Sequence, residues 1–209
     1  ANDLATGATA TNAFTYTVSD GVSTATATLI ITITGVNDQP VISDLGETLF
    51  YTLGNAATVI DNAVTISDSD DTQLVSAAVQ ITTNYESGED LLELASPPSN
   101  FSSSWDSASG TLTISAISGS DSLVNFANVL ETVTFRNTNA ASGNTNDRTI
   151  SWTASDDEIA SVPATSTIRI SAPSIDHYKV LIEGSDDPYS GNAPDTVLVT
   201  IEASFFSTL

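Results

Sequence analysis

Oxygen-bearing side chains, most of them aspartates, gather in the parts of this sequence that read as turns and linkers. Calcium is a hard cation that prefers carboxylate, amide and carbonyl oxygens, so these clusters are candidate Ca²⁺ ligands. The first group contains Asp20, Asn37, Asp38, Asp68, Asp70 and Asp71. Because corners and linkers meet at the ends of a β-sandwich, we expect this group to form one site at a joint between domains. No segment matches an EF-hand loop, so that geometry is not expected.

A second acidic group lies further along the chain and predicts a site at the following joint. It contains Asp156, Asp157, Glu158, Asp186 and Asp187. The linker there reads SAPSID and lacks the Asn-Asp pair of the first linker, with Asp176 as its substitute. Glu89 and Asp90 form a third acidic pair, which we interpret as an exposed turn before a strand.

Residues suited to catalysis are scarce. The chain has no cysteine and a single histidine, His177, which we place at the surface, so it offers neither a thiolate nor a histidine-based triad. Carboxylate pairs are plentiful, but nothing singles out one pair for glycoside hydrolysis. We expect no catalytic residues and no enzyme activity. Trp105 and Trp152 are interpreted as packing residues on strands.

The charge balance restricts the partners. The sequence holds 26 acidic and four basic residues, for a net charge of −22. Such a surface repels phosphate backbones and anionic lipids, so nucleic acid is excluded as a partner. The longest apolar run, TLIITITGV, is too short to span a bilayer, and membrane insertion is not expected. The surface also repels itself unless salt or bound cations screen it.

Strand patterns dominate and predict an all-β fold of antiparallel β-sandwiches. Thr, Val and Ile alternate with small polar residues in runs such as FTYTV, ATLIITIT, TLTIS, TISWTA, STIRI and YKVLI. Acidic and Gly-rich turns separate these runs at the short spacing that is typical of sandwiches. Only residues 120–133, with Leu123, Phe126 and Leu130 at helical spacing, can hold a helical turn.

An internal repeat divides the chain. Residues 14–36 match residues 150–172, with Tyr16 on Trp152 and Asp20 on Asp156. One extra residue near Val162-Pro163 then brings Ile33 into line with Ile170. Two copies of one closing hairpin imply two domain ends. The expected domains are therefore the end of one sandwich (1–36), an acidic linker (37–40), a complete sandwich (41–171) and the opening of a further sandwich (172–209).

These motifs resemble a known family. The stretch TVSDG…ATATLIITITGVNDQPV is similar to the cadherin-like and VCBS-type repeats of large bacterial RTX surface adhesins, in which a VNDxPV linker joins modules. The stretch from ATVIDNAVTISDSDD to DRTISWTASDD resembles a longer repeat of the same proteins. The resemblance covers residues 10–172. It implies secreted, calcium-rigidified tandem β-sandwiches, most of them structural extenders, with occasional ligand-binding modules.

Together these observations predict an extracellular, non-enzymatic structural module of a bacterial surface adhesin, active in cell adhesion or biofilm. Its partners would be adjacent repeats or neighbouring copies of itself, placed end to end. The terminal pieces would complete each other within one chain or between chains, and in the second case they would build a filament. The competing hypothesis is an adhesin module that binds a glycan or peptide.

Overall fold

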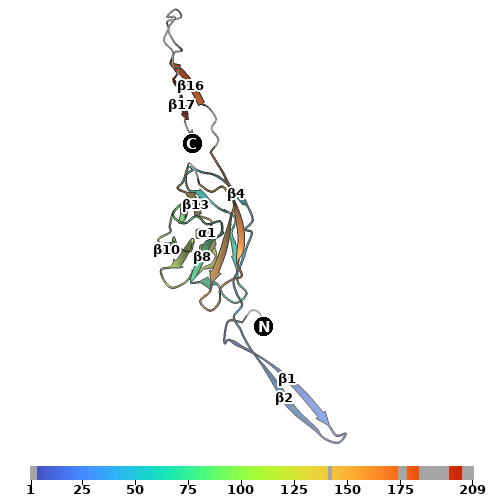
Figure 1. Cartoon of the computed structure of the whole chain (residues 1–209). Coiled ribbons are helices and arrows are strands. Elements are labelled where there is room, and N and C mark those ends of the chain that lie inside the picture. Colours follow the sequence, from blue (N-terminus) through green and yellow to red (C-terminus); the bar gives the residue numbers. More distant parts are fainter. Residues whose placement is uncertain (1–3, 141–142, 174–177, 184–197, 204–209) are drawn as a thin grey trace, which may run out of the picture.

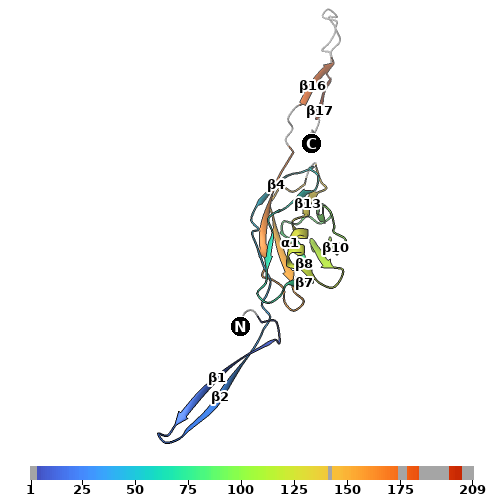
Figure 2. The same cartoon turned by 180° about the vertical axis from the view of Figure 1, so that it is seen from behind.

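The chain folds into a central β-sandwich with a two-stranded hairpin at each end, as Figure 1 shows. The computed structural model describes residues 4–140, 143–173, 178–183 and 198–203. The N-terminal hairpin pairs β1 (Thr9–Ser19) with β2 (Thr24–Thr34), and the C-terminal hairpin pairs β16 (Tyr178–Glu183) with β17 (Leu198–Ala203). Figure 2 shows the same two hairpins from behind, again at opposite ends of the sandwich.

The larger layer of the sandwich is a six-stranded sheet in the order β10–β11–β8–β14–β15–β4. Its neighbours pair antiparallel, except β15 and β4, which are parallel. Burial alternates along β8 and β14 because only one face of each strand meets the core. The strands are β4 (Thr48–Thr52), β8 (Ser76–Thr83), β10 (Phe101–Asp106), β11 (Thr111–Ala116), β14 (Arg148–Ser155) and β15 (Ala164–Ser171).

A three-stranded sheet in the order β5–β13–β9 packs on this layer, and two short strand pairs, β3–β6 and β7–β12, close the ends. Tyr51 of β4 meets Phe135 of β13 edge to face, with ring centroids 5.0 Å apart, which joins the two sheets through the core. The strands are β3 (Val41–Ser43), β5 (Thr58–Val59), β6 (Thr65–Ser67), β7 (Gln73–Leu74), β9 (Asp90–Leu94), β12 (Asp121–Ser122) and β13 (Val133–Asn137).

One short helix, α1 (Leu123–Leu130), packs on the core through Phe126, Val129 and Leu130 and confirms the helical turn expected within residues 120–133. The Ser122 hydroxyl caps it by accepting a hydrogen bond from the Asn125 N–H. Phe126 is buried on its inner face and packs edge to face on Phe101 of β10. The inner face of the helix therefore forms part of the hydrophobic core.

A buried ion pair also links the two layers. Arg148 on β14 donates from Nε to Oδ2 of Asp90 on β9 over 2.9 Å, and both side chains are fully buried. The Asn137 amide donates to Asp90 Oδ1 over 2.7 Å. The expectation that Asp90 lies in an exposed turn is wrong, because the buried guanidinium of Arg148 needs a carboxylate partner.

The β1–β2 hairpin is exposed along its whole length. Its register pairs Phe14 with Leu29 and Tyr16 with Ala27, so these residues share one face. The other face is almost entirely threonine, including Thr15 and its partner Thr28. The hairpin has the two-sided pattern of a strand pair that belongs to a sandwich.

The all-β class predicted from the sequence is confirmed, since antiparallel sheets dominate the described residues and α1 is short. Trp152 is a core residue, as expected: it is fully buried and donates from its indole N–H to the Ser166 hydroxyl. In the described part of the chain, no helix has the length and apolar character needed to cross a membrane.

Candidate metal centre

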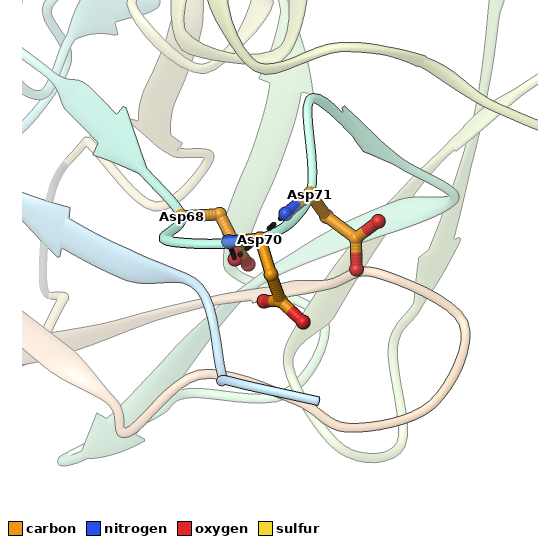
Figure 3. Close-up of side chains that lie close together, drawn as sticks. All are labelled: Asp68, Asp70 and Asp71. Atoms are coloured by element: carbon orange, nitrogen blue, oxygen red, sulfur yellow. Dashed lines mark hydrogen bonds between the residues drawn. The ribbon is translucent and has the colours of Figure 1, made fainter. Parts of the chain in front are cut away.

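The acidic loop between β6 and β7 brings three carboxylates together. Oδ1 of Asp68 accepts hydrogen bonds from the N–H groups of Asp70 and Asp71, each over 3.2 Å, which folds the loop into a tight Asx turn. The three side chains offer oxygen atoms within 4.8 Å of one another, enough to hold a metal ion. Figure 3 shows the three carboxylates gathered around this one turn.

The linker between the N-terminal hairpin and the sandwich runs directly past this loop. The Asp38 N–H donates to Oδ1 of Asp70 over 3.1 Å. The Asn37 amide donates to Oδ2 of Asp156 over 2.9 Å and to the Asp38 carbonyl over 3.0 Å. The sequence prediction that Asn37 and Asp38 converge with the 68–71 loop is therefore met by the geometry of the described residues.

Three carboxylate oxygens at this joint accept no hydrogen bond although they are buried: Asp38 Oδ2, Asp68 Oδ2 and Asp70 Oδ2. Buried polar atoms are almost always hydrogen-bonded, because burying an anionic oxygen without a partner is strongly unfavourable. One of the three comes from the linker and two come from the sandwich. A cation held by the 68–71 loop would satisfy the oxygens of Asp68 and Asp70, and the Asp38 backbone lies beside this loop. The buried oxygens without partners therefore support a metal ion independently of the number of acidic residues.

The electrostatics of the loop agree with this geometry. Burial raises the pKa of the Asp68 carboxyl, with a smaller contribution from Asp70. The pKa of Asp71 is also raised, first by burial and then by repulsion from Asp70, Asp68, Asp156 and Glu158. Both shifts mean that the ionised carboxylates of the loop are disfavoured, first by burial and then by the negative charges beside them. A bound divalent cation would reverse them.

The β14–β15 corner contributes to the same joint, and here the sequence assignment is wrong. Asp156 was assigned to the joint after the sandwich, but it contacts Asn37 in the linker before the sandwich. The reason is strand direction: β15 is eight residues long, about 27 Å at ~3.4 Å per residue, so the corner and the end of β15 lie at opposite ends of the sandwich.

The Asp156 carboxylate is firmly held in this corner. Oδ1 accepts hydrogen bonds from the N–H groups of Glu158 and Ile159, each over 2.8 Å. Burial is the largest single influence and raises the pKa of Asp156, but hydrogen bonds from Ile159, Asn37 and Glu158 together outweigh it, so the net pKa is lowered. Asp156 therefore stays ionised beside the acidic loop.

Two further residues of the second predicted group lie in this corner. Glu158 accepts a hydrogen bond from the Thr6 hydroxyl over 2.7 Å, which ties the segment before β1 to the sandwich. Asp157 is exposed, with a positive φ of 102°. Sequence reasoning missed Thr6, because a lone threonine in a turn before a strand carries no signal of its own.

Asp20 is not part of the joint, which corrects the first predicted group. It lies at the β1–β2 turn, at the far end of the hairpin from the linker, where Oδ1 accepts from the N–H groups of Val22 and Ser23. These bonds lower the pKa of Asp20. Four residues named from the sequence lie outside the described residues: Asp176, His177, Asp186 and Asp187.

Comparison with models of known protein families finds no match, and comparison with curated proteins finds none either. The functional argument for this chain therefore depends on its own residues.

Proposed function

We propose that this protein is a non-enzymatic extracellular structural module, an extender or end-to-end subunit of a bacterial surface adhesin, in which Ca²⁺ at the joint fixes the linker to the sandwich. One observation carries this proposal: the linker residue Asp38 and the sandwich residues Asp68 and Asp70 each bury a carboxylate oxygen without a hydrogen bond, where the Asp38 N–H meets Asp70. A metal ion held by both parts stiffens the joint between them.

Calcium suits this donor set better than other common metals. The described candidate ligands are all oxygens, and the chain has no cysteine to attract zinc or copper. Magnesium demands near-ideal octahedral geometry and keeps several waters, whereas calcium accepts irregular sets of six to eight oxygens. Asp38, Asp68, Asp70 and Asp71 would supply carboxylates, and water or backbone carbonyls would complete the shell.

Calcium would stiffen the joint because its binding is coupled to the position of the linker relative to the sandwich. With the linker swung away, the loop keeps the Asp68, Asp70 and Asp71 carboxylates but loses Asp38. The ion binds the closed joint more tightly than the open one, so it shifts the population toward the closed joint by that difference in affinity. Asn37 and Asp156 then hold the linker on the other side.

The test combines metal binding with shape. Titration calorimetry should detect Ca²⁺ binding that weakens at least tenfold in Asp70→Asn, while the control Glu47→Gln, an exposed carboxylate outside the loop, binds as wild type. Small-angle scattering should report one extended shape in calcium and a broader distribution after chelation. Absence of Ca²⁺ binding by the wild-type protein would overturn the proposal.

The alternative function, a glycan- or peptide-binding adhesin module, needs exposed aromatic residues at a concave site. The ring of Trp105 packs edge to face on Tyr85, with centroids 6.1 Å apart, beside the core, which agrees with its interpretation as a packing residue. Calcium-dependent binding to a glycan array, lost in Trp105→Ala, would favour this alternative.

A further inference from the structure

The chain folds back on itself where the β1–β2 hairpin meets the linker. Beyond the ends of the two strands, the Gly35 N–H donates to the Ala8 carbonyl over 2.8 Å, and the Gly7 N–H donates to the Gly35 carbonyl over 3.3 Å. The Ala8 N–H donates to the Ala5 carbonyl over 2.9 Å, which closes a tight turn. Residues 4–8 are thereby tied to the chain just before the linker.

Gly35 is the point of closest contact in this fold-back. It is buried, although it follows an exposed strand, and its φ is not positive. A Cβ added to Gly35 would overlap the backbone carbonyl oxygens of Leu4 and Ala5, and backbone atoms cannot turn aside as the end of a side chain can. Glycine is therefore required here for space, and the close approach fixes where residues 4–8 lie relative to the linker.

The same segment reaches the sandwich through Thr6. Its hydroxyl donates to Oε2 of Glu158 over 2.7 Å, and the Asn37 amide donates to Oδ2 of Asp156 over 2.9 Å. Both acceptors belong to the corner between β14 and β15, where the Glu158 N–H donates to Oδ1 of Asp156. We call these two contacts, Thr6–Glu158 and Asn37–Asp156, the corner clasp. One comes from before β1 and the other from after β2, so the clasp holds both strands of the hairpin.

The corner clasp and the acidic loop hold neighbouring residues of the linker. Asn37 belongs to the clasp, and the next residue, Asp38, donates from its N–H to Oδ1 of Asp70. Burial is the largest cause of the raised pKa of Asp71, and repulsion from the two corner carboxylates contributes to it, so the corner lies close to the loop. Because consecutive Cα atoms are only about 3.8 Å apart, movement of Asn37 away from the corner displaces Asp38 as well.

We infer that Thr6 and Glu158 are a positioning pair for the calcium joint: their contact holds the hairpin on the corner and so keeps Asp38 beside the 68–71 loop before an ion binds. The inference rests on the proposed function and adds the device that prepares its site. Without this contact, part of the free energy of calcium binding is used to order the linker, so the apparent affinity falls. Coupling between two sites is reciprocal, so bound calcium strengthens the clasp by the same factor.

Calcium titration of Thr6 variants tests the pair without changing any charge. Thr6→Val keeps the shape of the side chain but removes the hydroxyl donor, and it should weaken Ca²⁺ binding roughly threefold or more, because a hydrogen bond to a charged group is lost. Thr6→Ser retains the donor and should bind Ca²⁺ as wild type does. The control Thr17→Val, near the far end of the hairpin, should also bind as wild type.

A distance measurement in chelator tests the clasp without metal. The sequence contains no cysteine, so spin labels can be placed at Thr28→Cys on the hairpin and at Ser104→Cys on the exposed part of β10. Thr6→Val should broaden the distribution of distances between the labels, and Thr17→Val should not. Gly35→Ala should broaden it as well, because the added Cβ displaces the segment that carries Thr6. Equal widths with and without the Thr6 hydroxyl would overturn the inference.

The two measurements separate this inference from the proposed function. If wild type binds Ca²⁺ and Thr6→Val binds it equally well, the positioning pair is rejected and the calcium joint stands. If Thr6→Ser fails to restore the affinity that Thr6→Val loses, the hydroxyl is not the group that acts, and the inference is rejected as well. A wild-type chain that binds no Ca²⁺ overturns the proposed function, and the distances in chelator then decide by themselves whether Thr6 holds the hairpin on the corner.

Discussion

The joint is defined by individual oxygen atoms. Asp68 uses one carboxylate oxygen to fold its own loop and leaves the other buried without a hydrogen bond. Asp70 also uses only one of its oxygens. Its Oδ1 accepts a hydrogen bond from the Asp38 N–H, and its Oδ2 is buried without a donor. One oxygen of each residue thus shapes the site, and the other is left without a partner in a group of carboxylates that could hold a metal ion.

This arrangement gives the metal-free protein an unusual pH dependence. The pKa values of Asp68 and Asp71 lie above the ordinary 3.8, so the fold holds their protons more tightly than the unfolded chain does. Their ionisation destabilises the fold, and the free energy of unfolding should fall as pH rises from 3.8 through the folded pKa values. Urea unfolding in chelator should show this fall, and Asp71→Asn should make it shallower.

Asp106 provides the matched control for that experiment. Hydrogen bonds from the Ser109 hydroxyl and the Ala108 N–H lower its pKa, so its contribution is present above 3.8 and is lost as pH falls through its folded pKa. Asp106→Asn should therefore change stability without changing the slope above 3.8. An unchanged slope in Asp71→Asn would contradict the account of the loop.

Residue types predicted most of the candidate ligands, but they did not predict which hairpin corner lies beside the linker. The oxygen-rich linker and the 68–71 run indicate a cation site from chemistry alone. Whether Asp20 or Asp156 faces that linker depends on which way the hairpin strands point, and residue spacing does not contain this information. The internal repeat predicted that Asp20 and Asp156 are equivalent, and their matching turn geometry bears this out.

At the scale of elements, alternation predicted the strands best where Thr, Val and Ile dominate. The expected runs TLTIS and TISWTA correspond to β11 and β14. The expected runs leave out β8 and β10, whose alanines and serines carry little β propensity. Both strands pair with β11, and β8 buries alternate residues in the core, whereas β10 buries only Phe101 fully.

The buried ion pair between Arg148 on β14 and Asp90 on β9 joins two strands of different sheets, so breaking it should strongly destabilise the sandwich. Asp90→Ala would leave the fully buried guanidinium of Arg148 without a counter-charge and should destabilise the sandwich by about 3–5 kcal/mol. Chemical denaturation measures this change.

A double variant separates loss of charge from loss of packing. Asp90→Leu with Arg148→Met replaces both charges by apolar side chains and should be clearly more stable than Asp90→Ala, because no uncompensated charge remains. Equal destabilisation of the two proteins would show that the pair acts through shape and not through charge.

At the scale of the whole molecule, the net charge of −22 must be balanced by specific ions, by diffuse salt or by both. Screening by diffuse salt depends on ionic strength, whereas a site that binds Ca²⁺ adds RT ln(1 + [Ca²⁺]/Kd) to the stability of the part that contains it. The two effects therefore separate when calcium and sodium are compared at one ionic strength.

Calcium chloride should raise the melting temperature of the sandwich more than sodium chloride of the same ionic strength. At a calcium concentration 100-fold above Kd the specific contribution is about 2.7 kcal/mol, which corresponds to roughly 10 °C for a domain of this size. Differential scanning calorimetry of wild type and Asp70→Asn gives the answer. In Asp70→Asn the two salts should act alike, because screening survives the substitution and the site does not. If the salts already act alike on wild type, the acidity serves solubility, and the orphaned oxygens of Asp38, Asp68 and Asp70 need another partner.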